Sequence, residues 1–315
     1  MPSKKILVIV GPTASGKTRM AVELAKAHNG EVVSADSMQI YRRMDIGTAK
    51  PTAEEMDGVP HHMIDVADPE EDFSVARYVE MASACVDDIL ARGKLPIVAG
   101  GTGLYVDSLL SGRTFAAFSP DSSLRKELEA ELAERGGEAM LAELSRVDPE
   151  AAARLHPNDH KRIVRALEVY RSTGKTISEH NRETRALPPR YEALTIGLNF
   201  QDRADLWARI DARVDQMAAA GLEREVRELL SSGLSPRCTA MQAIGYKEFV
   251  AAVEGTMTWR EAEELVKLRS RQYAKRQLTW FRRNPEVHWL LWEKNPNFGN
   301  ARQRSTELLE EFGLG

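Results

Sequence analysis

Short apolar runs rich in β-branched residues alternate with segments of helical periodicity over the first hundred residues. The first run, from Ile6 to Val10, lies between Lys5 and Gly11. A continuous apolar run of this length is typical of a strand buried on both faces of a parallel sheet. The same patterns predict strands at 31–35 and 95–99 and helices at 18–27 and 74–92. This alternation predicts an open α/β sheet with right-handed crossovers and a ligand site at the carboxyl ends of its strands.

The pattern changes near Ser119. Residues 119–187 contain no strand-like run and are dense in Ala, Leu, Glu and Arg at helical spacing, which predicts an all-helical insertion domain. Pro188 and Pro189 end this segment, and an apolar run at 194–198 predicts that the sheet resumes. Helices at roughly 203–231 and 259–283 and a strand at 287–291 follow. We therefore predict an α/β core from residues 1–118 and 188–315, interrupted by the helical insertion.

A phosphate-binding loop joins the first strand to the first helix. Residues 11–18 fit the pattern G-x-x-x-x-G-K-[ST], and they lie where that motif needs to lie, after a buried strand and before a helix. We therefore expect a parallel sheet of the P-loop NTPase type, flanked by helices. Backbone amides would surround a diphosphate or nucleotide phosphate chain, and Thr18 would help to hold Mg²⁺, the expected cofactor. The predicted phosphate-binding residues are Gly11, Pro12, Thr13, Ala14, Ser15, Gly16, Lys17 and Thr18.

The acidic residue that usually completes a P-loop nucleotidase is missing from its expected place. The strand at 95–99 is followed by glycines and Thr102 rather than by an aspartate that could hold the metal. Asp65, after a very short apolar stretch, is a weak substitute. This absence disfavours ordinary ATP hydrolysis and leaves room for a different diphosphate leaving group.

Two further polar residues are expected at the carboxyl edge of the sheet. Asp36 follows the second predicted strand, where a carboxylate can bind metal, accept a proton from a nucleophile, or cap a helix. Thr102 lies between glycines that let the backbone approach a ligand closely. Its hydroxyl could donate to a phosphate or cap the next helix.

Charge is unevenly distributed along the chain. Its 315 residues are 43% apolar and 29% charged, as in ordinary globular proteins, and the formal net charge of −4 taken alone disfavours a nucleic-acid binder. However, residues 54–88 contain 11 acids and one base, whereas residues 266–283 contain seven bases and no acid. The basic segment could be an amphipathic helix with Leu268, Leu278 and Phe281 facing inward. Alternatively, it could be a phosphate-binding stripe with Tyr273 or Trp280 available for stacking on bases.

Cysteine usage and hydropathy point to a cytoplasmic protein. Cys85 and Cys238 have no partner spacing that would indicate a disulfide framework or a zinc site. The apolar run near the N-terminus is too short for a signal peptide, and no stretch approaches a membrane span. We therefore expect no membrane association.

Several segments, in the same order over residues 10 to 290, resemble the bacterial tRNA dimethylallyltransferases. They are GPTASGKT (11–18), SADSMQIYR (34–42), GTAKP (47–51), HHMIDV (61–66), VAGGTGLY (98–105), KRIVRALEVY (161–170) and AIGYKE (243–248). The resemblance implies transfer of the dimethylallyl group of dimethylallyl diphosphate to the exocyclic amine of the adenine just 3′ of the tRNA anticodon. Diphosphate would be the leaving group, so no nucleotide γ-phosphate is needed.

The resemblance also implies roles for individual residues. Asp36 would take a proton from the amine, Lys17 and Arg213 would bind the diphosphate, and Thr102 would contact the reacting region. Ser37, Met38 and Gln39 would surround the inserted base, with Asp36 and Thr102 also contacting the tRNA. From the residues alone, Arg213 would be an ordinary arginine on a solvated helix face.

The tRNA partner implied by the resemblance is the anticodon stem-loop, in which an unpaired base can leave the stack. The insertion domain would then contact tRNA, and we expect the protein to act as a monomer. The remaining residues implied as tRNA contacts are Arg125, Lys161, Arg162, Ile163, Val164, Arg165, Gln242, Ala243, Ile244, Gly245, Tyr246 and Lys247.

Three other functions remain open from the residues themselves. The α/β core could belong to a P-loop kinase of a small metabolite or nucleotide, although no adenine pocket or lid arginines can be identified. An adenylate isopentenyltransferase would share the loop chemistry but act on free nucleotide. A non-catalytic RNA-binding regulator could retain the loop as a relic. The long helical insertion and the basic segment favour a macromolecular acceptor.

Overall fold

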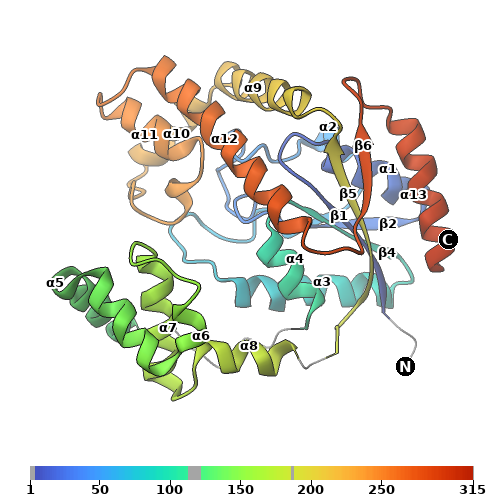
Figure 1. Cartoon of the computed structure of the whole chain (residues 1–315). Coiled ribbons are helices and arrows are strands. Elements are labelled where there is room, and N and C mark those ends of the chain that lie inside the picture. Colours follow the sequence, from blue (N-terminus) through green and yellow to red (C-terminus); the bar gives the residue numbers. More distant parts are fainter. Residues whose placement is uncertain (1–3, 113–121, 186–187, 315) are drawn as a thin grey trace. The chain divides into compact units, whose positions relative to one another are not determined.

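The computed structural model of this chain describes residues 4–112, 122–185 and 188–314. Two compact units are present, one from Met1–Leu110 with Arg190–Gly315 and the other from Ser111–Pro189 (Figure 1). The helical segment expected at 119–187 thus lies within the second unit. No helix in the described ranges is long and apolar enough to cross a membrane.

A parallel sheet forms the centre of the first unit. Its six strands in the described residues have the order β3-β2-β4-β1-β5-β6. Every neighbouring pair is parallel, and Val8 in the middle of β1 is in register with Val98 of β4 and Thr195 of β5. The strands are β1 (Lys5–Val10), β2 (Gly30–Ser34), β3 (His61–His62), β4 (Leu95–Gly100), β5 (Glu192–Phe200) and β6 (His288–Trp292). The predicted parallel α/β fold is therefore confirmed.

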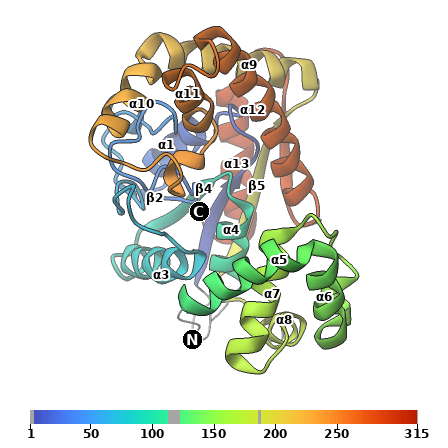
Figure 2. The same cartoon turned by 90° about the vertical axis from the view of Figure 1, so that its left-hand side faces the viewer.

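Helices cover both faces of this sheet. Leu7 and Ile9 of β1 belong to a core that includes apolar side chains of α1 and α13, while α3 packs against β2 and β4 (Figures 1 and 2). In the described residues of this unit the α-helices are α1 (Lys17–Ala27), α2 (Ala53–Met56), α3 (Val75–Ala91), α4 (Gly103–Leu110), α9 (Arg203–Ala220), α10 (Leu222–Ser231), α11 (Tyr246–Val253), α12 (Trp259–Phe281) and α13 (Phe298–Phe312), and a short 3-10 helix lies at Ala240–Gln242. The loops that follow β1, β2 and β4 lie at the same edge of the sheet, as parallel topology requires.

In its described part the second unit is all helical and has its own core. Helix α5 packs along α7 around Leu128, Met140, Ile163 and Leu167 (Figure 2). Its helices are α5 (Ser122–Val147), α6 (Pro149–Ala152), α7 (His160–Thr173) and α8 (Ile177–Arg185). The backbone of Gly136 is non-helical, so α5 bends there.

The structure corrects two details of the predicted helices. The segment at 203–231 is not one helix, because Gly221 has a φ of 102° and separates α9 from α10. Leu268 does not face inward: its exposed fraction is 43%, so this part of the amphipathic-helix interpretation is wrong. The buried line of α12 runs through Ala262, Val266, Ala274, Gln277 and Phe281, and position 268 falls outside it.

Candidate functional site

The loop between β1 and α1 is shaped by glycines that no other residue could replace without strain. Gly11 has a φ of 149°, and a Cβ atom there would lie 2.3 Å from the carbonyl oxygen of Leu198. Gly16 has a φ of 89° and precedes α1 directly, with no side chain capping the helix. The first amides of α1 therefore remain available to an anion, and the helix dipole favours negative charge at this end.

Two residues with hydroxyl groups, Ser15 and Thr18, lie in this loop and in the first turn of the helix that follows it. The Ser15 Oγ atom is buried and has no hydrogen-bond partner among the described residues. Thr18 lies in the first turn of α1 and is partly buried. The described residues contain no group of three or more His, Cys, Asp or Glu side chains that could hold a metal ion. Any Mg²⁺ here would thus take few ligands from the protein.

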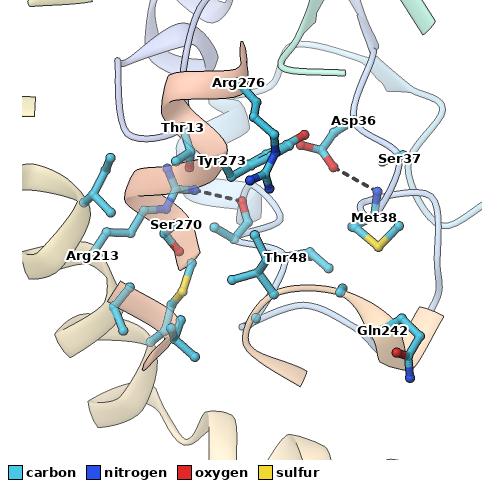
Figure 3. Close-up of a pocket in the computed structure, with 18 of the residues that line it drawn as sticks. Thr13, Asp36, Ser37, Met38, Thr48, Arg213, Gln242, Ser270, Tyr273 and Arg276 are labelled. Carbon is cyan, nitrogen blue, oxygen red and sulfur yellow. Dashed lines mark hydrogen bonds between the residues drawn. The ribbon is translucent and has the colours of Figure 1, made fainter. Parts of the chain in front are cut away.

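A cavity of about 400 Å³ opens beside the phosphate loop (Figure 3). Its wall combines segments that are far apart in the sequence: the loops after β1 and β2, residues 47–49, helix α9, residues 239–244 and helix α12. Polar lining residues include Thr13, Asp36, Ser37, Thr48, Arg213, Gln242, Ser270, Tyr273 and Arg276, and apolar ones include Met38, Ile210, Val214, Met217, Ile244 and Val266. The cavity can therefore hold a ligand with both a charged and an apolar part.

Asp36 and Thr102 lie together at the carboxyl edge of the sheet. The Asp36 Oδ1 atom accepts a hydrogen bond of 2.9 Å from the Met38 amide, which fixes the carboxylate against the cavity (Figure 3). The Thr102 Oγ1 atom accepts from the Ser37 amide at 3.0 Å and donates to Ser37 Oγ at 3.3 Å. Thr102 thus joins the loop after β4 to the loop after β2 through its side chain.

Two cations approach Asp36 from different elements. The Lys17 Nζ atom donates to the Pro12 carbonyl at 2.7 Å, and Arg213 on α9 donates through Nη2 to the Ala49 carbonyl at 3.4 Å. The pKa of Lys17 is lowered to about 8. Burial is the largest cause, the charge of Arg213 also lowers the pKa, and the charge of Asp36 acts in the opposite direction. Burial likewise lowers the pKa of Arg213, against the effect of Asp36. Two partly desolvated cations beside a phosphate loop favour a multiply charged anion.

Helix α12 supplies lining residues that the sequence analysis did not assign to this site. Ser270, Tyr273 and Arg276 all line the cavity (Figure 3). The pKa of Tyr273 is raised to about 12. Burial is the largest cause and the charge of Asp36 adds to it, whereas hydrogen bonds with Thr102 and Gln277 act in the opposite direction. Tyr273 is therefore a neutral hydroxyl group near Asp36 at physiological pH.

Gln277 on α12 connects two of the loops. Its Oε1 atom accepts from the Thr13 amide at 2.9 Å, and its Nε2 atom donates to the Gly101 carbonyl at 2.9 Å. Gln277 is 5% exposed and lies on the buried line of α12. The sequence does hold a signal for Gln277, because it is a polar residue at a position of α12 that faces inward. A buried side-chain amide needs hydrogen-bond partners for both its oxygen and its nitrogen, so such a residue is a candidate for linking two segments.

The basic segment 266–283 is less free than its sequence suggests. Lys267 pairs with Asp215, Glu263 and Glu264, and the Arg271 guanidinium pairs with Asp211 at 2.6 Å. The Trp280 Nε1 atom donates to Asp107 at 2.9 Å, and its ring packs against Gly103. The cations of this part of α12 that remain as candidates for binding phosphate are therefore Arg269, Lys275 and Arg276.

The predicted RNA-contacting residues differ in exposure. Gln242 and Lys247 are exposed in the first unit, and Lys161 and Arg162 are exposed on α7 of the second unit. Arg125 and Arg165 both pair with Glu168, at 3.5 and 2.8 Å. Three other side chains, those of Ile163, Val164 and Tyr246, are buried in their own units, so we restrict the predicted side-chain contacts with RNA to their exposed neighbours. Ala243 and Ile244 line the cavity instead, next to the buried Gly245.

A family model and curated relatives both match most of this chain. The IPP transferase family model matches residues 39–284. The tRNA dimethylallyltransferase of Acetivibrio thermocellus is 50% identical to this chain, and the match covers 90% of this chain and 91% of that protein. The tRNA dimethylallyltransferase of Geobacter sulfurreducens is also 50% identical, and the match covers 98% of this chain and 97% of that protein.

Solved structures are similar over almost the whole chain. A crystal structure of the full-length tRNA isopentenylpyrophosphate transferase of Bacillus halodurans has a TM-score of 0.73 at 44% identity, covering 98% of this chain and 97% of that one. A eukaryotic dimethylallyltransferase acting on tRNA has a TM-score of 0.84 at 31% identity, covering 98% of this chain and 79% of that one. The chain belongs to the IPP transferase family.

Proposed function

We propose that this protein is a tRNA dimethylallyltransferase. It transfers the dimethylallyl group of dimethylallyl diphosphate to the exocyclic amine of the adenine on the 3′ side of the anticodon and releases diphosphate. The observation that carries the proposal is the cavity itself, in which Thr13 of the phosphate loop, Arg213 and the Asp36 carboxylate line one space. Such a site can bind a diphosphate ester and take a proton from an acceptor.

The phosphate loop would hold the diphosphate and stabilise it as a leaving group. The open amides at the start of α1, together with Lys17 and Arg213, provide positive charge where negative charge develops as the allylic carbon–oxygen bond breaks. Because these groups are fixed before the reaction, little reorganisation is needed in the transition state. Dimethylallyl diphosphate is therefore the donor that we assign to this loop.

Mg²⁺ fits the donor set of the loop. It prefers oxygen ligands and usually keeps water and substrate phosphate oxygens in its shell, so the hydroxyl groups of Ser15 and Thr18 would be sufficient protein donors. When bound, the ion supplies further charge neutralisation to the diphosphate.

Asp36 would act on the acceptor. The lone pair of an adenine amine is delocalised into the ring, so the amine is a weak nucleophile until a base accepts its proton. As the nitrogen–carbon bond forms and the carbon–oxygen bond breaks, the proton passes to the Asp36 carboxylate, and diphosphate leaves with the bonding electron pair. The bond from the Met38 amide keeps the carboxylate in place for this transfer. Thr102, which is bonded to the Ser37 amide, and Tyr273, whose pKa the charge of Asp36 raises, are polar side chains of the same region.

Residues next to Asp36 would shape the space for the adenine. Met38 and Ser37 line the cavity, whereas Gln39 uses its amide within the protein, bonding to Ser34 and to the carbonyls of Thr48 and Ala49. We therefore propose that Gln39 stabilises the cavity wall formed by residues 47–49 and does not contact the adenine itself. The exposed Lys161, Arg162 and Lys247 are the candidates for contacts with tRNA phosphates. We expect a cytoplasmic monomer.

The proposal is tested with unmodified tRNA, Mg²⁺ and dimethylallyl diphosphate. After digestion to nucleosides, mass spectrometry should find one adenosine that has exchanged a hydrogen for a dimethylallyl group, mapped to the position 3′ of the anticodon. AMP in place of tRNA tests for the enzyme that acts on free nucleotide, and ATP with small metabolites tests for a kinase. Product on AMP alone, or phosphate transfer from ATP without any prenylation, would overturn the proposal.

A further inference from the structure

A buried carboxylate outside the reacting groups holds one wall of the cavity. Glu225 on α10 is 9% exposed, and the arginines of this helix, Arg224 and Arg227, pair with Glu228 and Glu223 instead. Its Oε2 atom accepts from the amides of Asp45 and Ile46 at 2.9 and 2.8 Å. Its Oε1 atom accepts from the Gly47 amide at 3.1 Å and from the Tyr246 hydroxyl at 2.5 Å.

Three consecutive amides that point at one carboxylate define the conformation of the segment that carries them. A buried carboxyl group is costly unless its oxygens are bonded, so Glu225 and the folded segment stabilise each other. Gly47 fits closely against Tyr246, since a Cβ atom on Gly47 would lie 2.5 Å from the ring. Glu225 of α10 and Tyr246 of α11 thus hold the segment together.

The segment held in this way carries groups that face the proposed substrates. Gly47, Thr48 and Ala49 line the cavity. The Ala49 carbonyl accepts from Arg213 Nη2 at 3.4 Å and from Gln39 Nε2 at 3.2 Å. One backbone carbonyl therefore contacts both the cation assigned to the diphosphate and the side chain next to the proposed base site.

We propose that Glu225 is a positioning residue for the transfer reaction. Through residues 45–49 and the Ala49 carbonyl, it sets the place of Arg213 against the diphosphate. This inference rests on the proposed function, because it takes the ligand of Arg213 to be the diphosphate of the donor. Glu225 itself does not line the cavity and touches no reacting atom.

The test is a double-mutant cycle read by the affinity for inorganic diphosphate in the presence of Mg²⁺. Glu225→Gln presents an NH₂ group where an acceptor is needed, so it should weaken diphosphate binding about tenfold. In a background that already carries Arg213→Ala, the same change should have little effect, because effects that act through one group are not additive. An equal loss in both backgrounds would overturn the inference, since it would show that Glu225 does not act through Arg213.

Three further variants separate positioning from general destabilisation. Glu31→Gln removes a carboxylate of similar burial at the amino-terminal end of β2 and should lower the thermal midpoint without changing diphosphate affinity. Tyr246→Phe removes one of the four hydrogen-bond donors to the Glu225 carboxylate and should change diphosphate affinity only slightly. If Glu225→Gln does not fold, Gly47→Ala takes its place in the cycle, because the added Cβ would clash with the Tyr246 ring and displace the segment.

The outcomes also distinguish this inference from the proposed function. If the protein binds diphosphate and the losses of affinity in Glu225→Gln and Arg213→Ala are additive, the proposed function stands and the role of Glu225 is refuted. Coupled losses in a protein that never prenylates tRNA would show that Glu225 positions Arg213 at a diphosphate site, and they would refute the proposed transfer reaction. Failure of the unaltered protein to bind diphosphate refutes both.

Discussion

The depressed pKa of Lys17 predicts that diphosphate binding depends on pH in the range just above neutrality. Lys17 titrates near pH 8 because it is buried and because Arg213 lies close to it. The protonated amine is the form that attracts diphosphate, so affinity should be highest below pH 8 and fall as the pH rises through it. If only the protonated form binds, raising the pH from 7 to 9 increases the dissociation constant about tenfold.

Calorimetric titration of the protein with inorganic diphosphate and Mg²⁺ at several pH values measures this change. Diphosphate itself gains charge over the same range, so the affinity of the unaltered protein is divided by that of a Lys17→Ala variant at each pH. The ligand's own titration cancels in this ratio. The ratio should fall about tenfold between pH 7 and pH 9, with its midpoint near pH 8.

The causes of the shift give a second, signed expectation. Asp36 raises the pKa of Lys17, so Asp36→Asn should move the midpoint to lower pH. Arg213 lowers that pKa, so Arg213→Met should move the midpoint to higher pH, even though affinity is weaker throughout. A ratio that does not change between pH 7 and pH 9, or midpoints that move in the same direction in both variants, would refute the assignment of Lys17.

Other side chains give predictions of different kinds. Asp36→Ala should abolish turnover while tRNA affinity stays largely intact; lost affinity with normal turnover would reverse its role. Lys161→Ala should weaken tRNA binding and reduce the slope of log affinity against log salt by about one, and an unchanged slope would exclude a phosphate contact. Gln277→Leu leaves the half-buried Thr13 amide and the buried Gly101 carbonyl unpaired, so it should lower the unfolding free energy by about 1–3 kcal/mol in denaturant titrations and should also weaken diphosphate binding. If neither quantity changes, Gln277 does not bridge the two loops. Hydrogen bonding to Arg92 holds the pKa of Glu31 far below its usual range, so Glu31 stabilises the folded protein above about pH 4.5 and this contribution is lost as the pH falls. Glu31→Gln should therefore lower the unfolding free energy by about 1–2 kcal/mol at pH 7 and by much less in strong acid. An equal cost of Glu31→Gln at both pH values would refute the ion pair.

The parts of this site that could be predicted from the sequence are local. The phosphate loop is contiguous with the strand before it and the helix after it, so pattern and spacing were sufficient. Asp36 and Thr102 follow strands of one parallel sheet, whose carboxyl ends must share an edge. Their closeness, with Thr102 bonded to Ser37, follows from this topology.

The parts that could not be predicted depend on how helices dock. Helical periodicity shows that α12 has a buried line, but not which neighbour meets each face, so Tyr273 and Arg276 could not be placed at the cavity. For the same reason Leu268 was expected inside. Lys267 also pairs with Asp215 on α9, and Arg271 pairs with Asp211 on α9. The sequence of α12 alone gives no indication of these two partners.

The docking of these helices explains why chemistry from the first third of the chain depends on residues from the last third. The loops after β1 and β4 are bridged by Gln277 of α12, and the segment at 45–49 is held by Glu225 of α10. In both cases backbone groups that a loop cannot satisfy by itself are satisfied by one buried side chain. Because a backbone group left unpaired in this interior is costly, the loops keep their shape only while these helices are docked. A substitution that loosens α10 or α12 should therefore reduce diphosphate affinity before it unfolds the sheet, although neither Gln277 nor Glu225 lines the cavity.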